Sequence, residues 1–120
     1  MAQKILVVDD SSSMRQMISF TLKSAGYEVE EANDGQKGLE VAKTQKFDLI
    51  FTDVNMPVMD GLAFTKEVRK LPNYKFTPIL VLTTEAGTDK KMEGKAAGAT
   101  GWLVKPFNPE QLLNTAKRVL

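Results

Sequence analysis

Four short apolar runs without a polar break constrain the fold of this chain more than any other feature. They occupy residues 5–8, 49–51, 79–82 and 102–104. A strand that is buried on both faces needs apolar side chains at successive positions. Residues 27–30 instead alternate apolar and acidic side chains, which predicts an edge strand with one solvated face. The sequence therefore predicts five strands.

Helical patterns separate these strands. Apolar residues at spacings of three and four predict helices over residues 14–25, 39–42, 64–71, 92–99 and 112–119. The first follows a serine cluster that can cap it and ends before Gly26. The last opens with Asn108, Pro109 and Gln111, which is typical of a capped helix with a proline in its first turn.

Five strands that alternate with five helices predict a doubly wound α/β fold, because each parallel return needs a crossover that is usually helical. The expected architecture is a five-stranded parallel sheet flanked by five helices. In such sheets ligands bind beyond the carboxyl ends of the strands, where the direction of winding switches. The functional residues are therefore expected at the strand ends.

Composition excludes several kinds of chemistry. The 120 residues contain no cysteine and no histidine, and 16 Lys and Arg balance 15 Asp and Glu for a net charge of +1. Disulfides, zinc fingers, histidine-activated nucleophiles and His-ligated metals are thus excluded. No basic patch predicts nucleic-acid binding, and no apolar stretch predicts a signal peptide or a membrane span. We expect one cytoplasmic domain without a membrane partner.

Polar residues follow the predicted strands. Asp9 and Asp10 follow the first, Asp53 the third, Thr83 ends the fourth and Lys105 follows the fifth. Three carboxylates brought together either raise one another's pKa or bind a cation. Because no imidazole or thiolate is present, an all-oxygen site predicts Mg²⁺.

Each of these residues also has a simpler interpretation. An acidic pair before a helix commonly caps it and interacts with its dipole. Asp53 alone could be a turn residue, Thr83 could satisfy loop backbone, and Lys105 could be a solvated surface charge. Only their joint occurrence favours a site.

Four segments together resemble the receiver domain of two-component response regulators. They are Asp9-Asp10, the stretch from Asp53 through Pro57 to Gly61, Thr83-Thr84-Glu85, and residues 98–107 with Lys105-Pro106. The resemblance covers nearly the whole chain, in order and at matching spacing, and is strongest to single-domain receivers of the chemotaxis CheY type. It implies a flavodoxin-like strand order 2-1-3-4-5 over residues 1–120, with no output domain.

The resemblance implies a role for each residue of the site. Asp53 would accept a phosphoryl group from a histidine kinase. Asp10, Asp53 and the main-chain carbonyl of Asn55 would hold Mg²⁺, with Asp9 acting mostly through a bound water. Lys105 would pair with Asp53 at rest and with the phosphoryl group afterwards, and its bond to Pro106 would be cis.

Further residues would transmit and time the signal. Thr83 would donate its hydroxyl to the phosphoryl group, and an aromatic side chain in the fifth strand would turn inward. Here that residue is Trp102, whereas the family usually has Tyr or Phe, and a static surface indole is the alternative. Asn55 and Glu85 match positions that tune hydrolysis, which a phosphatase could exploit.

Two hypotheses remain open for the output. The first is phosphorylation-dependent binding to the flagellar motor switch, and the second is a phosphorelay or kinase-signalling adaptor unrelated to motility. The lysines at positions 90, 91 and 95 are either a solvated face or, with Trp102, a partner surface. We expect a monomer that catalyses only its own phosphorylation and dephosphorylation.

Two other classes fit the sequence less well. A Mg²⁺-dependent aspartyl-phosphate phosphohydrolase would need a general acid or base two residues after Asp53, where this chain has the amide Asn55. A flavodoxin-like electron carrier would need a phosphate loop rich in glycine and hydroxyl residues after the first strand, which is absent.

Overall fold

A computed structural model describes residues 3–84 and 95–120 of the chain. The strands are β1 (Lys4–Val8), β2 (Glu28–Ala32), β3 (Leu49–Asp53), β4 (Ile79–Thr83) and β5 (Gly101–Val104). The helices are α1 (Ser12–Ser24), α2 (Gly35–Thr44), α3 (Gly61–Arg69), the short 3₁₀ turn η1 (Pro72–Tyr74) and α5 (Pro109–Val119). All five predicted strands are thereby confirmed.

The strands form one parallel sheet in the order β2-β1-β3-β4-β5. This confirms the doubly wound fold and its strand order. From β1 the chain adds β2 on one side, and all later strands are added on the other side. The switch in winding direction therefore falls between β1 and β3, which are the strands that lead into Asp9 and Asp53.

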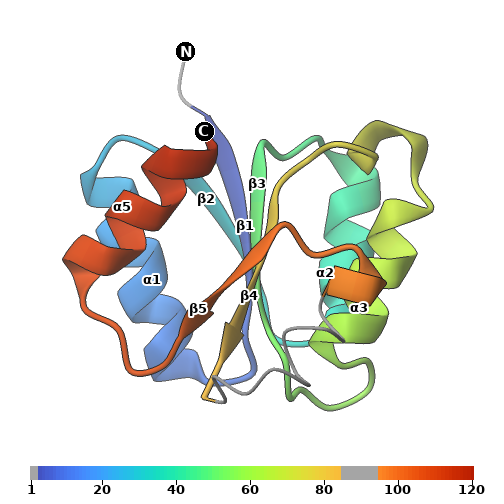
Figure 1. Ribbon diagram of the computed structural model, residues 1–120, viewed down its shortest axis with the longest axis horizontal. Helices are drawn as coiled ribbons and strands as arrows, with labels where there is room; N and C mark the ends of the chain where they lie inside the picture. Colours follow the sequence, from blue (N-terminus) through green and yellow to red (C-terminus); the bar gives the residue numbers. More distant parts are fainter. Residues whose placement is uncertain (1–2, 85–94) are drawn as a thin grey trace.

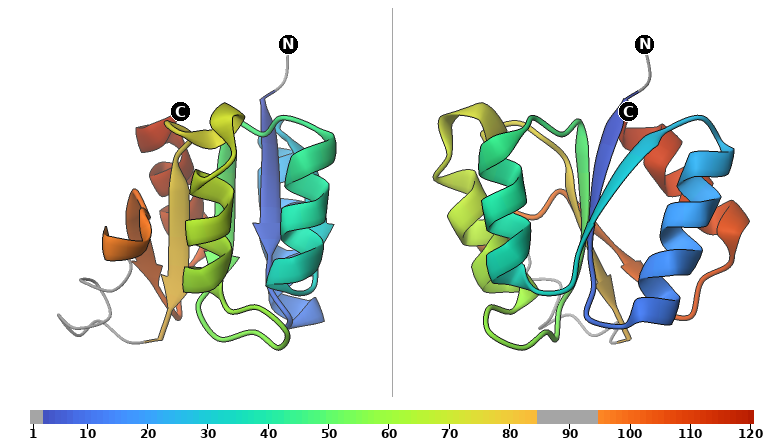
Figure 2. Two further views of the ribbon diagram at one scale, coloured as in Figure 1. Left: turned by 90° about the vertical axis from the view of Figure 1, so that its right-hand side faces the viewer. Right: turned by 180° about the vertical axis from the view of Figure 1, so that it is seen from behind.

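Helices cover both faces of the sheet. Figure 1 shows α1 and α5 on one face and α2 and α3 on the other, and Figure 2 shows the same layers from two further directions. Alternate residues of β1 serve the two cores. Leu6 and Val8 pack toward α2 and α3, whereas Ile5 and Val7 pack toward α1 and α5. Because both faces of β1 are buried, its side chains at residues 5–8 are apolar at successive positions.

Side chains cap each described helix of more than one turn at its amino end. Oxygens of Ser11, Asp34 and Asp60 accept the N–H groups of Met14, Lys37 and Ala63. Asn108 and Gln111 bond reciprocally at 2.8 and 2.9 Å, so the predicted capping box of α5 is confirmed. Gly26, with φ +97°, follows the end of α1 as predicted.

The amino end of the sheet is held by Arg69, the last residue of α3. Its Nη1 donates to the carbonyl oxygens of Tyr74 and Thr77, each at 2.6 Å, and its Nε donates to that of Gly98 at 2.9 Å. One guanidinium thus joins α3, the segment before β4 and the segment before β5. We call this arrangement the Arg69 knot.

The predicted fourth helix, over residues 92–99, lies partly outside the described residues. Residues 95–97 are helical, and Lys95 is exposed. Met92, Lys90 and Lys91 fall in the undescribed segment, so the lysine partner surface stays a prediction. Across residues 3–84 and 95–120, no helix combines the length and the apolar character needed to cross a membrane.

Candidate functional site

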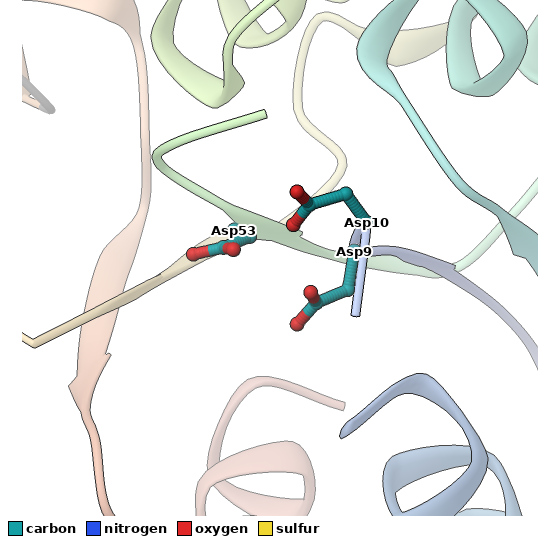
Figure 3. Close-up of side chains that lie close together, drawn as sticks. All are labelled: Asp9, Asp10 and Asp53. Atoms are coloured by element: carbon teal, nitrogen blue, oxygen red, sulfur yellow. The ribbon is translucent and has the colours of Figure 1, made fainter. Parts of the chain in front are cut away.

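Three carboxylates meet at the carboxyl end of the sheet. Asp9 and Asp10 follow β1, and Asp53 is the last residue of β3. One ligand oxygen from each lies within 4.8 Å of the others, and Figure 3 shows the three side chains together. Asp9 is buried, Asp10 is exposed and Asp53 lies between these extremes. The acidic cluster predicted from the strand ends is thus present.

Strand register explains why these residues meet. Val8 of β1 lies opposite Thr52 of β3. The residues that follow this pair, Asp9 and Asp53, therefore leave neighbouring strands at the same level. Because Asp53 is the last residue of a central strand, its carboxyl group lies at the carboxyl end of the sheet while the rest of the strand is buried.

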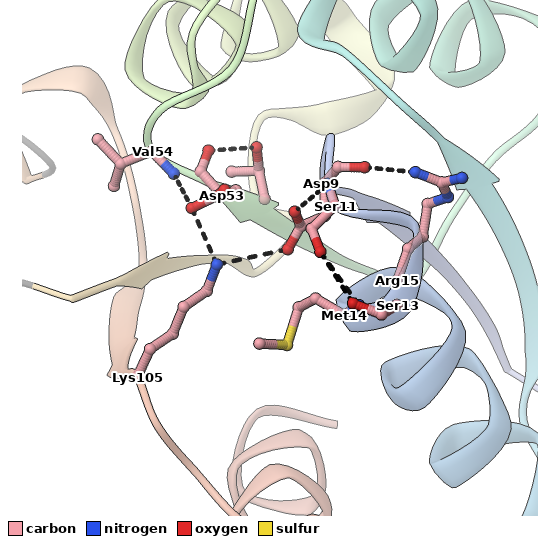
Figure 4. A network of polar contacts seen from close by, with 9 residues as sticks. Asp9, Ser11, Ser13, Met14, Arg15, Asp53, Val54 and Lys105 are labelled. Carbon is pink, nitrogen blue, oxygen red and sulfur yellow. Dashed lines mark hydrogen bonds and ion pairs between the residues drawn. The ribbon is translucent and has the colours of Figure 1, made fainter.

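Asp53 is held by two donors. Its Oδ1 accepts the Val54 N–H at 2.9 Å and lies 3.2 Å from the Lys105 ammonium, as Figure 4 shows. Burial raises the pKa of the Asp53 carboxyl above its ordinary value, and the Asp9 carboxylate raises it further. Lys105 and the Val54 N–H act in the opposite direction without cancelling the rise. The Asp53 carboxyl is therefore harder to ionise in the folded protein than a free aspartate is.

Lys105 is shared between two carboxylates. Its Nζ lies 3.2 Å from Asp53 Oδ1 and 3.5 Å from Asp9 Oδ2. Its backbone N–H donates to the Thr83 carbonyl at 2.7 Å, which fixes the exit of β5 against β4. The Lys105–Pro106 peptide bond is cis, as the family resemblance implied. A lysine is a compact charge on a flexible stem, so Nζ can move while its backbone stays in place.

Asp9 is deeply buried yet well bonded. Its side chain has no exposed surface. Its Oδ1 accepts the Ser11 N–H at 2.9 Å, and its Oδ2 faces Lys105. Buried charges need such partners to offset the loss of hydration. Asp9 is therefore less open to a ligand than Asp10.

Two of the remaining predicted residues, Thr83 and Trp102, lie on the strands β4 and β5. Thr83 ends β4, is buried, and is paired in register with Val104 of β5. Trp102 lies on β5 opposite Val81 and is 37% exposed. Asn55 is exposed in the loop two residues beyond Asp53, and Glu85 lies outside the described residues. The indole is thus placed at the surface, and its inward rotation stays a prediction.

The donor set fits a hard divalent cation. The clustered side chains supply carboxylate oxygens, and the chain has no histidine or cysteine. Burial first, and the Asp9 carboxylate second, raise the pKa of Asp53, and a bound cation would counter both effects by favouring the charged carboxylate. Oxygen ligands of this kind suit Mg²⁺, Mn²⁺ or Ca²⁺.

The loop after Asp53 contains features that sequence reasoning missed. A side chain at Gly61 would place its Cβ 1.9 Å from the Asp53 carbonyl oxygen, so only glycine fits. The Asp60-Gly61 pair could have signalled this close approach. Val58 has φ +69°, and the N–H of Met59 donates to the Pro57 carbonyl at 2.7 Å across it. This is a strained γ-turn, and a valine gives no signal of one.

The structure thus has a parallel sheet with an acidic cluster at its winding switch and a lysine paired with that cluster, which is the arrangement that the sequence resemblance implied. The profile of the response regulator receiver domain matches residues 5–117. The chain belongs to this family.

Individual relatives agree with this assignment. Chemotaxis protein CheY-3 of Vibrio cholerae is 39% identical over 110 residues, which cover 91% of this chain and 85% of that protein. The solved structure of V. cholerae chemotaxis protein CheY4 has a TM-score of 0.98 and 62% identity, with 100% of both chains covered. The chain is thus similar to single-domain chemotaxis receivers.

A further solved structure bears on the metal. The receiver domain of the sensor histidine kinase PA1611 from Pseudomonas aeruginosa has a TM-score of 0.91 and 33% identity, covering 98% of this chain and 97% of that one. That receiver domain has a magnesium ion coordinated in its active-site cleft. Receiver domains therefore bind Mg²⁺ at an acidic pocket of the kind that this chain forms.

Proposed function

We propose that Asp53 accepts a phosphoryl group from a phosphohistidine on a partner kinase, and that the phosphorylated chain signals by binding another protein. The observation that carries this proposal is the position of Asp53 at the winding switch, bonded to Lys105 and adjoining Asp9 and Asp10. Family membership supports the same assignment. The chain acts on its own aspartate and on no external substrate.

The transfer exchanges one bond for another. A bond forms between a carboxylate oxygen of Asp53 and phosphorus, while the phosphorus–nitrogen bond of the phosphohistidine breaks. The electron pair of that bond stays on the kinase imidazole. Hydrolysis of the resulting acyl phosphate by water restores the carboxylate. Such transfers depend mainly on positioning and on neutralisation of charge.

Asp10, Asp53 and the main-chain carbonyl of Asn55 would hold Mg²⁺, and Asp9 would contribute through a bound water. The bound ion would offset the repulsion between the carboxylate and the phosphoryl oxygens. Asp9 is suited to an indirect role because Ser11 and Lys105 already occupy its oxygens. Asp10 is suited to direct binding because it is exposed.

Lys105 and Thr83 would bind the phosphoryl oxygens. Lys105 Nζ already lies 3.2 Å from Asp53 Oδ1, and its flexible stem lets the ammonium follow the transferred group. Thr83 ends the strand next to β3 and would donate its hydroxyl. An inward turn of Trp102, on the adjoining strand β5, would then report the change at the protein surface.

Labelling tests the acceptor. With Mg²⁺ and a small phosphodonor such as acetyl phosphate, we expect one acid-stable, base-labile phosphate per chain by intact mass. Asp53→Asn should abolish it. Asp48→Asn, a matched substitution of an exposed aspartate before β3, should leave it unchanged. Stoichiometric labelling of Asp53→Asn would contradict the proposal, and multiple turnover of an aryl phosphate would favour a phosphohydrolase.

The chain's single tryptophan tests the switch. Binding of beryllium fluoride with Mg²⁺ imitates phosphorylation, so Trp102 emission should change if the indole moves inward. The variant Asp53→Asn serves as the control. Unchanged emission despite calorimetrically confirmed binding would favour a static surface indole.

For the output, we propose a chemotaxis role at the flagellar motor switch, because the relatives named above include two chemotaxis proteins. The alternative is a phosphorelay or adaptor role, since a receiver of the same fold belongs to a sensor kinase. Binding to purified motor-switch protein that increases with beryllium fluoride would support the first. Equal binding with and without it would contradict that assignment.

A further inference from the structure

Arg15 connects the acidic cluster to the neighbouring strand. It lies in the first turns of α1, and its Nη1 donates to the main-chain carbonyl of Asp9 at 2.7 Å. Its Nε lies 3.0 Å from Oε1 of Glu31 on β2. The side chains of Arg15 and Glu31 are only 19% and 33% exposed. Figure 4 shows the guanidinium beside the Asp9 carbonyl.

The backbone of Asp9 is consequently tied to β2 on both sides. Its N–H donates directly to the Ala32 carbonyl at 3.1 Å. Its carbonyl is tied through Arg15 to Glu31, the residue before Ala32. A planar peptide moves as one unit, so fixing this carbonyl also fixes the bond that leads into Asp10.

Asp10 depends on this constraint more than its neighbours do. The Asp9 and Asp53 carboxylates each accept a backbone N–H and face Lys105. Within residues 3–84 and 95–120, by contrast, no donor bonds the exposed carboxylate of Asp10. The direction in which the Asp10 side chain leaves the main chain is therefore set by its backbone and not by a hydrogen bond to its carboxylate.

We propose that Arg15 is a positioning residue for the metal site. Its guanidinium joins the Asp9 carbonyl to the Glu31 carboxylate and thereby orients the Asp9–Asp10 peptide so that Asp10 points at Asp53. The inference rests on the proposed function, because it assigns Asp10 to Mg²⁺ binding. It concerns geometry rather than charge, since the neighbouring Glu31 offsets the charge of the guanidinium.

Calorimetric titration with Mg²⁺ tests the proposal without any phosphoryl transfer. Arg15→Gln should weaken Mg²⁺ binding by about tenfold, the lower end of what loss of a residue supporting a metal ligand costs. Lys70→Gln removes the same charge from an exposed pair with Glu67 and should leave the affinity unchanged. Arg15→Lys keeps the charge but loses the planar guanidinium that bonds two acceptors at once, so it should recover only part of the affinity.

A second variant separates positioning from folding. Glu31→Gln leaves Arg15 in place and weakens only its ion pair, so Mg²⁺ affinity should fall by about twofold to threefold. Thermal unfolding monitored by circular dichroism establishes that each titrated variant is folded. If Arg15→Gln does not fold, Glu31→Gln decides, and unchanged affinity in it overturns the proposal.

Two further results would also overturn it: wild-type affinity in folded Arg15→Gln, or full recovery in Arg15→Lys, which would show that charge alone matters. Failure of the proposed function would give another result, because the wild-type chain itself would then take up neither Mg²⁺ nor phosphate.

Discussion

The two ends of the sheet differ in how their charged side chains are neutralised. At the carboxyl end, Asp9, Asp10 and Asp53 crowd together around Lys105. At the amino end, the Arg69 guanidinium is surrounded by neutral carbonyl oxygens. The first arrangement retains repulsion that a ligand can relieve, whereas the second leaves little for a ligand to improve. The comparison indicates that the carboxyl end of the sheet is suited to ligand binding, whereas the amino end stabilises the fold.

The amino end also contains like charges, but each is hydrogen-bonded. Lys46 Nζ donates to Thr77 Oγ1 at 2.6 Å and lies 4.4 Å from the centre of the Tyr74 ring. Burial lowers the pKa of Lys46, and the nearby Arg69 lowers it further, against the opposing effect of Asp48. Crowding of charge is thus not enough to mark a binding site. What distinguishes the carboxyl end is that its exposed member, Asp10, depends on its backbone alone for position.

The largest expected effect comes from breaking the Arg69 knot. Arg69→Met should lower the free energy of unfolding by about 3 kcal/mol, because several buried carbonyl groups lose their donor. Urea unfolding measures this loss. Labelling of Asp53 at low temperature, where the variant remains folded, should stay stoichiometric. An Arg69→Met variant that keeps its stability but loses phosphorylation would contradict the assignment of stability to the amino end and of binding to the carboxyl end.

At the carboxyl end, removal of a charge should raise the free energy of unfolding instead of lowering it. The pKa of Asp53 is raised in the folded protein, so the folded state keeps a proton that the unfolded chain has lost. This carboxyl therefore makes the fold less stable as pH rises from its ordinary pKa through its folded pKa. Asp53→Asn should raise the free energy of unfolding at neutral pH by about 1 kcal/mol without metal.

The pH dependence of that gain identifies its cause. The advantage of Asp53→Asn should shrink as pH falls through the same window, and Mg²⁺ should stabilise the wild type more than the variant. Asp48→Asn is the matched control at the amino end, where the carboxylate accepts the Lys4 N–H at 2.9 Å. It should bring no gain. A gain from Asp53→Asn that is independent of pH would argue against burial and crowding of the charged carboxylate as its cause.

The smallest expected effect concerns the strained turn. Val58 is 81% exposed at φ +69°, so little packing is lost on substitution. Val58→Gly should raise the free energy of unfolding by about 0.5 kcal/mol, because relief of left-handed strain exceeds the extra entropy of the unfolded chain. Val58→Ala keeps a Cβ and should gain less. Equal gains would show that the β-carbon is not the source of strain.

Sequence reasoning captured what depends on side-chain pattern. Unbroken apolar runs predict β1, β3 and β4, because both faces of those strands are buried, and polar residues at the strand ends predict the acidic cluster. It missed Arg15 and Arg69, because both bind main-chain carbonyl groups, which every residue possesses. The strain at Val58 escaped notice for a similar reason, since backbone angles in a loop follow from tertiary contacts rather than from the side chain alone.

The parallel topology has a consequence for folding. Asp9, Asp53, Thr83 and Lys105 lie at the carboxyl ends of four different strands, and the ion pair between Asp9 and Lys105 spans 96 positions of the chain. No single hairpin or half of the sheet contains a complete acceptor site. Such long-range closure forms only with the whole sheet. Under the proposed function, acceptance of a phosphoryl group at Asp53 therefore requires the complete sheet.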